Sequence, residues 1–317
     1  MGKILITGGA GFIGSHLCDR FIADGHEVIC IDNFLSGSRD NLTHFKSNSH
    51  FTFIEHDVCQ PIPNLPSNID AILHFASPAS PNPESPISYM RYPVETIMVN
   101  TLGSQRMLEL AVANNCQIIF ASTAEVYGNP EVHPQPETYV GHVSPNGPRS
   151  SYDEGKRAME ALAFAYYRLG GTKIKVIRLF NTYGSRMRLD DGRIVPNLLK
   201  SYLQDEPFAI YGDSSTTRSF AYIDDILDGI MRVYRSDQMI GEVVNLGNPQ
   251  EFTLGETLKL FEKTIGHPLK TMLKPAPPED PVRRSPDISK ATKLLGWQPK
   301  ITFAEGLKKT LEYYRHA

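Results

Sequence analysis

The segment Gly8-Gly9-Ala10-Gly11-Phe12-Ile13-Gly14 decides the fold of this chain of 317 residues. It follows an apolar run over Lys3–Thr7, which is typical of a buried β-strand, and it opens a helical pattern over Gly14–Asp24. Its glycines match two spacings that bind dinucleotides, because they let the backbone approach a pyrophosphate at the N-terminus of a helix. The position between a strand and a helix is the context that this motif requires. We therefore predict a dinucleotide site here.

The first half of the chain alternates apolar runs with segments of helical period. The apolar runs are Lys3–Thr7, Glu27–Ile31, Phe51–Glu55, Asp70–Phe75, Gln117–Ser122 and Lys173–Leu179. The helical patterns between them include Gly14–Asp24, Val94–Asn114 and Tyr152–Leu169. Continuous apolar strands that alternate with helices predict an α/β fold with a doubly wound parallel sheet, the Rossmann arrangement, covered on both faces.

This alternation ends after about Phe180. Helical patterns return at Tyr222–Arg235, Leu254–Ile265 and Phe303–Tyr314. We therefore expect a cofactor-binding domain over residues 1–180 and a smaller C-terminal substrate-binding domain over residues 181–317. In this interpretation the chain returns to the sheet near residues 220–248.

Composition narrows the possible function classes. The net charge is −3, so we expect no nucleic-acid partner. No apolar run approaches a membrane span, and the N-terminus runs directly into a strand, so we expect neither a membrane partner nor a signal peptide. The four cysteines are scattered without metal-ligand spacing, which predicts no metal site and reduced thiols in a cytoplasmic protein: Cys18, Cys30, Cys59 and Cys116.

Asp32 ends the second predicted strand, after the glycine segment. A carboxylate there accepts from ribose hydroxyls and repels a 2′-phosphate, which favours NAD over NADP. The alternative is a strand-end aspartate that caps a turn. Asp57, after the third strand, could meet the adenine or could be a plain surface residue. The candidate cofactor-binding residues are Gly8, Gly11, Phe12, Ile13, Gly14, Asp32, Asn33, Asp57, Val58, Ala76, Ser122, Tyr152 and Lys156.

Tyr152 and Lys156 are four residues apart, so they share one helix face. A nearby ammonium lowers the pKa of a phenol from its usual value of about 10, which would make Tyr152 a general base. On its own this spacing also describes a solvated helix face. Ser122 and Thr123, at the end of the preceding predicted strand, add hydroxyls that could bind a substrate oxygen. Together these residues predict hydride transfer from an alcohol to a nicotinamide.

With these residues in place, the chain resembles the extended short-chain dehydrogenase/reductase family, in its nucleotide-sugar branch. The similarity covers nearly the whole chain, and within the branch the chain looks most like UDP-glucuronate decarboxylases. The more specific stretches are His74–Pro81, Ser122–Gly128, Glu131–Gln135, Gly147–Arg149, Tyr152–Arg157, Phe180–Met187, Asp190–Arg193 and Asn245–Pro249.

The resemblance implies a mechanism in which Tyr152 removes the proton of the sugar C4 hydroxyl while hydride passes from C4 to NAD. The 4-keto group is β to the C6 carboxylate, so loss of CO2 leaves an enolate, and the returned hydride gives UDP-xylose. Thr123 would hold the C4 oxygen and Lys156 the nicotinamide ribose. Glu125 would lie beside the reacting carbons; its alternative is a salt bridge to a neighbouring basic side chain.

A UDP-sugar acid brings phosphate and carboxylate charges that a net-acidic chain must meet with local basic groups. The resemblance implies that Arg284 lies near the phosphates and the reacting region. The alternative for any one arginine is a surface ion pair of little energetic value. The candidate substrate-binding residues are Asn181, Arg186, Asn197, Tyr211, Arg218 and Arg284.

Ala124 departs from the pattern of the family. Decarboxylases often have serine there, and dehydratases that eliminate water use an aspartate, so alanine counts against a dehydratase. A UDP-glucuronate 4-epimerase, which forms the same 4-keto acid, remains an alternative. A non-catalytic NAD-sensing module is a third, although such a module would be expected to lose Tyr152 or Lys156.

The helices predicted over Val94–Asn114 and Tyr152–Leu169 carry wide apolar stripes. In the family such helices form a four-helix interface, so the resemblance implies a homodimer. Packing against the sheet explains part of the same stripes.

Overall fold

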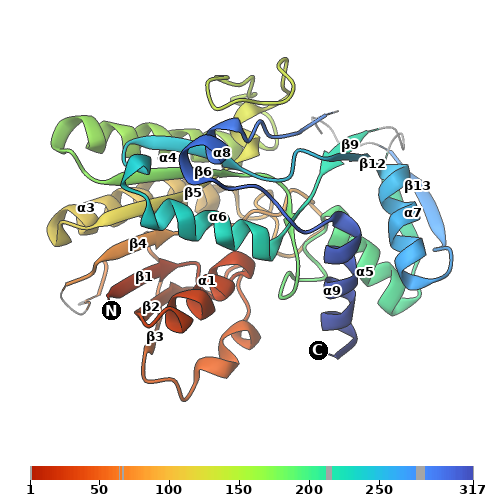
Figure 1. Ribbon diagram of the computed structural model, residues 1–317, viewed down its shortest axis with the longest axis horizontal. Coiled ribbons are helices and arrows are strands. Elements are labelled where there is room, and N and C mark those ends of the chain that lie inside the picture. Colours follow the sequence, from red (N-terminus) through yellow and green to blue (C-terminus); the bar gives the residue numbers. More distant parts are fainter. Residues whose placement is uncertain (1, 64, 66–67, 212–215, 276–282, 317) are drawn as a thin grey trace.

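A parallel sheet forms the centre of the computed structural model, which describes residues 2–63, 65, 68–211, 216–275 and 283–316 (Figure 1). The sheet has seven strands in the order β11-β6-β5-β4-β1-β2-β3, and every neighbouring pair is parallel. The expected doubly wound fold is therefore confirmed. The strands are β1 (Lys3–Thr7), β2 (Glu27–Asp32), β3 (Phe51–Glu55), β4 (Ala71–His74), β5 (Gln117–Thr123), β6 (Ile174–Leu179) and β11 (Glu242–Leu246).

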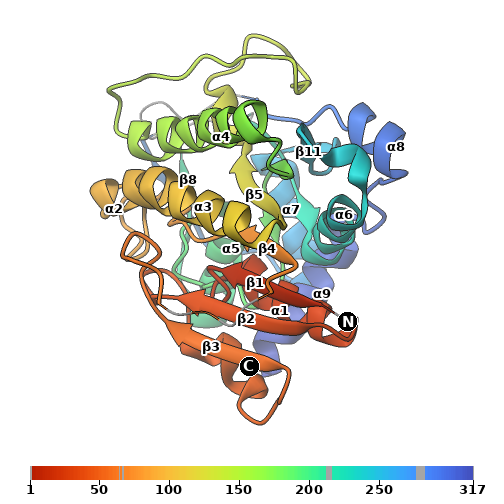
Figure 2. The same cartoon turned by 90° about the vertical axis from the view of Figure 1, so that its left-hand side faces the viewer.

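Helices cover both faces of this sheet, as Figure 2 shows. Alternate residues of a strand point to opposite faces, so Ile4 and Ile6 pack with Leu17 and Phe21 of α1, whereas Leu5 belongs to the core on the opposite face. The helices on the first face are α1 (Phe12–Ala23), α6 (Ile223–Arg235) and α8 (Ser289–Leu295). Those on the second face are α3 (Ser104–Asn114) and α4 (Ser150–Gly170).

The helix expected over residues 94–114 is interrupted. It consists of α2 (Pro93–Met98), a π-helical turn over Val99–Gly103, and α3. Asn100 lies in this turn, fully buried, and its amide donates to the carbonyl oxygen of Thr96 at 2.8 Å and to Oγ of Ser77 at 3.1 Å. A π turn inserts one residue without changing the apolar stripe much, so periodicity alone does not reveal it.

The C-terminal half contributes both to the sheet and to a second core. Strand β11 pairs with β6, and a separate apolar cluster includes Leu198, Phe208, Phe261 and Phe303. The division of the chain into two domains at residue 180 stays a prediction. The remaining helices are α5 (Ile194–Gln204), α7 (Leu254–Ile265) and α9 (Phe303–His316), with short helical turns at Arg39–Phe45, Ala124–Tyr127 and Asp237–Met239. The remaining strands are β7 (Thr182–Tyr183), β8 (Phe208–Tyr211), β9 (Thr217–Ser219), β10 (Ala221–Tyr222), β12 (Glu251–Thr253) and β13 (Thr271–Lys274).

The strand order reverses between β1 and β4, so the loops that follow these two strands run in opposite directions. This divergence leaves a crevice at the carboxyl edge of a doubly wound sheet. Within the described ranges, no helix has both the length and the apolar character needed to span a membrane.

Candidate active site

A cavity of about 1100 Å³ lies where the loops after β1, β2, β4 and β5 meet the C-terminal half. The structure therefore brings together residues from both halves of the sequence, and their individual roles stay predictions. Each candidate site residue contributes to the cavity wall: Gly8, Gly11, Phe12, Ile13, Gly14, Asp32, Asn33, Asp57, Val58, Ala76, Ser122, Thr123, Glu125, Tyr152, Lys156, Asn181, Arg186, Asn197, Tyr211, Arg218 and Arg284.

The glycine segment forms a tight turn between β1 and α1. Gly8 has a φ of 73°, and the amide of Gly11 donates to the Gly8 carbonyl oxygen at 3.0 Å. A Cβ on Gly14 would overlap that same carbonyl group, so a larger residue cannot occupy this position without moving the turn. The N-terminus of α1 has no side-chain cap. Its first-turn amides are thus suited to an anionic ligand such as a pyrophosphate.

Asp32 supports this turn from the end of β2. Its Oδ2 accepts from the amide of Ala10 at 2.9 Å and its Oδ1 from the amide of Phe34 at 2.7 Å. Burial raises the pKa of Asp32, and the backbone donors act against that rise. The alternative function of a strand-end cap is thus present. Each carboxylate oxygen keeps a second lone pair, so a ribose contact stays compatible with the geometry.

Tyr152 is buried in the first turn of α4, beside the end of β5. Its hydroxyl is hydrogen-bonded with Thr123, and the ring of Tyr89 stacks on its ring at 4.7 Å with an interplanar angle of 5°. Burial raises the pKa of Tyr152 to about 12, and the Thr123 hydrogen bond and the charge of Arg193 act against that rise. The phenol therefore lies next to the hydroxyl that the sequence predicts to bind a substrate oxygen.

Lys156 lies one helical turn after Tyr152 and is also buried. Its Nζ donates to the carbonyl oxygen of Ala121 at 2.7 Å and lies 5.8 Å from the Tyr152 ring centroid. Burial lowers the pKa of Lys156 itself to about 7, and the charge of Glu160 acts against that change. Desolvation is therefore the main cause of the pKa shift of each group.

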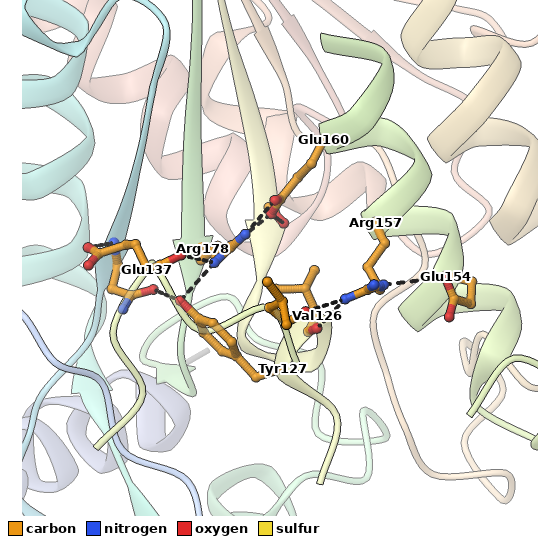
Figure 3. A network of polar contacts seen from close by, with 10 residues as sticks. Val126, Tyr127, Glu137, Glu154, Arg157, Glu160 and Arg178 are labelled. Atoms are coloured by element: carbon orange, nitrogen blue, oxygen red, sulfur yellow. Dashed lines mark hydrogen bonds and ion pairs between the residues drawn. The ribbon is translucent and has the colours of Figure 1, made fainter. Parts of the chain in front are cut away.

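A buried polar network lies behind these residues, and sequence reasoning missed it (Figure 3). Ser122 donates through Oγ to Oε1 of Glu160 at 2.5 Å, and Glu160 pairs through Oε2 with Nη2 of Arg178 at 2.7 Å. Arg178 also donates through Nη1 to the hydroxyl of Tyr127 at 3.0 Å. The hydroxyl of Ser122 is thus directed to Glu160. The spacing of Glu160, eight residues after Tyr152 on the same helix face, is a signal that could have revealed it.

Glu125 lies between two arginines in the short helical turn after β5. Its Oε2 accepts from Nη2 of Arg149 at 2.5 Å, and its Oε1 accepts from Nη1 of Arg284. Burial raises the pKa of Glu125, but the charges of Arg149 and Arg284 more than offset this and lower it to about 2. Glu125 is consequently a carboxylate at neutral pH. Arg149 was not among the predicted site residues.

Besides Arg284, three other predicted substrate-binding residues make polar contacts within the protein. Arg186 pairs through Nη1 with Oδ2 of Asp19 on α1 at 2.5 Å, which matches the ion-pair alternative. Asn197 donates to the carbonyl oxygen of Gly192 at 2.8 Å. Arg218 donates through Nη1 to the carbonyl oxygen of Thr217 at 2.8 Å. All three residues still contribute to the cavity wall.

The described part of the chain contains no set of side chains that could bind a metal ion. No group of three or more His, Cys, Asp or Glu side chains there could hold a metal ion.

Known proteins with similar sequences and structures carry names from one branch of enzymes. UDP-glucuronic acid decarboxylase 1 of Danio rerio is 46% identical over 312 residues, which are 98% of this chain and 72% of that protein. The solved UDP-glucose 4-epimerase of Thermotoga maritima with UDP-glucose has a TM-score of 0.88 at 30% identity, with 99% of each chain covered. UDP-glucuronic acid 4-epimerase of Bacillus cereus, solved in complex with UDP-glucuronic acid and NAD, has a TM-score of 0.86 at 28% identity, again over 99% of each chain.

These similarities confirm the resemblance to extended short-chain dehydrogenases that the motifs predicted. The matching family pattern extends over residues 4–247 and thus includes the glycine turn, Thr123, Tyr152 and Lys156. On this basis the chain belongs to the NAD dependent epimerase/dehydratase family.

Proposed function

We propose that this chain is an NAD-dependent decarboxylase that converts UDP-glucuronate into UDP-xylose and CO2. The observation that carries the proposal is the pairing of the Tyr152 phenol with Thr123 beside a carboxylate and two arginines, Glu125, Arg149 and Arg284. A buried alcohol-oxidising pair next to groups that complement anions suits a substrate that is both an alcohol and an acid. The sequence is 46% identical to the decarboxylase of Danio rerio but only 28–30% identical to the two epimerases. This difference favours decarboxylation over epimerisation.

The residues present fit NAD. The turn of Gly8 and Gly14, the uncapped N-terminus of α1 and the carboxylate of Asp32 would hold its pyrophosphate and ribose, and Lys156 its second ribose. NAD would supply a hydride acceptor that is regenerated in each turnover.

The protein's own groups account for the proton transfers and for binding. Tyr152 takes the proton of the C4 hydroxyl. Thr123, which is hydrogen-bonded with Tyr152 in the free protein, orients the C4 oxygen when the substrate binds. Burial raises the pKa of Tyr152 to about 12, so the phenol carries its own proton at neutral pH and must release it before it can accept the proton from C4. The proton that Tyr152 accepts is returned when the C4 oxygen is restored. CO2 departs from the β-keto acid, and a proton is added at C5, so the overall change is UDP-glucuronate plus a proton to UDP-xylose plus CO2.

The test is a direct assay. Purified protein is incubated with NAD and UDP-glucuronate, and CO2 release and the sugar product are followed by NMR. Formation of UDP-xylose with equimolar CO2 supports the proposal. UDP-galacturonate without CO2 would instead identify an epimerase, and NAD binding without any turnover would identify a sensing module.

Two further properties belong to the same proposal. We propose a homodimer that uses α2, α3 and α4. Apolar side chains are exposed on α2 and α3 at Val94, Ile97, Met98 and Val112, and on α4 at Tyr167 and Leu169. Light scattering at several protein concentrations tests this. We also propose a cytoplasmic location, in keeping with four cysteines that are all free thiols, and a two-domain division at residue 180.

A further inference from the structure

Arg149 connects the proposed catalytic helix to Glu125. It stands immediately before α4, three residues before Tyr152, and is 7% exposed. Its Nη2 donates to Oε2 of Glu125 at 2.5 Å, and its Nε lies 3.9 Å from Oδ2 of Asp153. Arg149 therefore fixes the carboxylate that follows β5 relative to the turn of α4 that carries the phenol.

Arg284 contacts Glu125 from the opposite side and is held independently. The backbone of its neighbour Ser285 exchanges hydrogen bonds with Gln135, whose amide donates to Ser285 O at 2.9 Å and whose Oε1 accepts from Ser285 N at 3.0 Å. Nη2 of Arg284 donates to the Gly128 carbonyl oxygen at 3.2 Å. Its Nε is a buried donor without a partner among the described residues. Such a donor on the wall of a cavity indicates a group that a ligand satisfies.

We propose that Arg149 is a positioning residue that holds the Glu125 carboxylate in place when Arg284 turns its donors to the anionic groups of the UDP-sugar. The inference rests on the proposed function, because it assigns Arg284 to the substrate. Two cations share one carboxylate here. Without Arg149, any engagement of Arg284 by substrate would leave Glu125 as a buried charge without compensation, which is strongly unfavourable.

The charges that face Glu125 determine how it titrates. Arg149 faces it from the position just before α4, and Tyr152 and Asp153 face it from α4 itself. Arg284 faces it from the C-terminal segment, and Tyr89 from the loop after β4. Removal of Arg149 takes away a cation that lowers the pKa of the carboxyl, while burial continues to raise it. The pKa of Glu125 therefore rises, and the acid limb of kcat/KM moves to higher pH.

The experiment compares Arg149→Gln with Arg149→Lys. In Arg149→Gln we expect the acid limb to move up by at least about one pH unit and the Kd for UDP-glucuronate, measured by calorimetry, to weaken about tenfold, as loss of one charged hydrogen bond implies. NAD affinity should stay within about twofold, because Arg149 contacts Glu125 and Asp153 rather than the glycine turn. Arg149→Lys keeps the charge, so its acid limb should return toward that of the wild type.

Arg157→Gln is the matched control. Arg157 lies in α4, but it donates to the carbonyl oxygens of Val126 and Val140, and its Nε lies 3.4 Å from Oε2 of Glu154 (Figure 3). It does not contribute to the cavity wall. We expect its pH profile and its Kd for UDP-glucuronate to match those of the wild type.

An unchanged pH profile and Kd in Arg149→Gln would overturn the inference. If that variant does not fold, Glu125→Gln is compared with the double variant Glu125→Gln/Arg149→Gln. Because position 125 then carries no charge, the single and the double variant should have the same pH profile and Kd values that agree within about twofold. A further loss of affinity of about tenfold in the double variant would equally overturn the inference about Arg149. Because Kd does not depend on turnover, binding without CO2 release would disprove the proposed function and still leave the role of Arg149 measurable.

Discussion

At the scale of single residues, burial dominates the chemistry of the site. Tyr152 and Lys156 stand on one helix face, yet desolvation raises the pKa of Tyr152 to about 12 and lowers the pKa of Lys156 to about 7. The phenol is thus protonated at neutral pH and needs further positive charge to accept the substrate proton as the hydride leaves. The hydrogen bond with Thr123 already favours the phenolate.

Replacement of this phenol tests the assignment of the base. In Tyr152→Phe we expect kcat to fall by about 10²–10⁴-fold, the usual contribution of a positioned general base. Binding of NAD and of UDP-glucuronate should persist, since the ring still stacks on Tyr89. Single-turnover kinetics and calorimetry measure the two quantities, and a kcat within tenfold of the wild type would remove Tyr152 from the proton transfer.

At the scale of elements, two features shape the site. One is the turn between β1 and α1, and the other is the ion pair that joins α4 to β6. In Gly14→Ala the new methyl group would overlap the Gly8 carbonyl group, so the turn must open and withdraw from the cofactor. We expect a loss of NAD affinity of at least about tenfold and a lower melting temperature, as for overpacked sites.

Gly170→Ala is the control for the glycine variant. Gly170 is the last residue of α4, and a Cβ there would meet nothing within 4 Å. Alanine is the better helix former, so stability should be unchanged or rise by up to about 1 kcal/mol. Equal NAD affinity in both alanine variants would show that the turn is not the cofactor site.

The pair of Glu160 and Arg178 ties α4 to β6 directly behind Ser122. In Arg178→Met we expect unfolding free energy to fall by about 3–5 kcal/mol, because a buried carboxylate loses its partner. Denaturant unfolding measures this. Arg39→Gln breaks an exposed pair with Glu55 at 2.8 Å and should cost less than about 1 kcal/mol. If the two variants lose similar amounts, the network is not structural.

At the scale of the whole molecule, apolar runs predicted the sheet well because strands buried on both faces have little choice of composition. β1, β3 and α7 begin and end where the patterns place them. The π turn at Val99–Gly103 was not predictable, since the apolar stripe continues through it. The strand order was not predictable either, because one apolar run does not indicate which strands will lie beside it. For the same reason the sequence pattern did not show that both halves of the chain meet at one cavity.

The candidate site was predictable where a residue type is required locally, and not where a partner comes from distant sequence. Gly14 follows from the needs of the turn, Tyr152 from its spacing to Lys156, and Thr123 from its place at the end of a predicted strand. The contact of Arg186 with Asp19 joins α1 to the loop after β7, and that of Glu125 with Arg284 spans 159 positions. Such pairings depend on the finished fold, so spacing could name the arginines but not the carboxylates that they contact.

The measurement that tests the central claim most directly is the fate of hydrogen at two sugar carbons. UDP-glucuronate is converted in ²H2O in the presence of NAD, and the product is examined by NMR. The account predicts UDP-xylose with one deuteron at C5 and the original hydrogen at C4, because that hydride is removed and returned within one turnover. Deuterium at C4, or a product that retains its carboxylate, would contradict it.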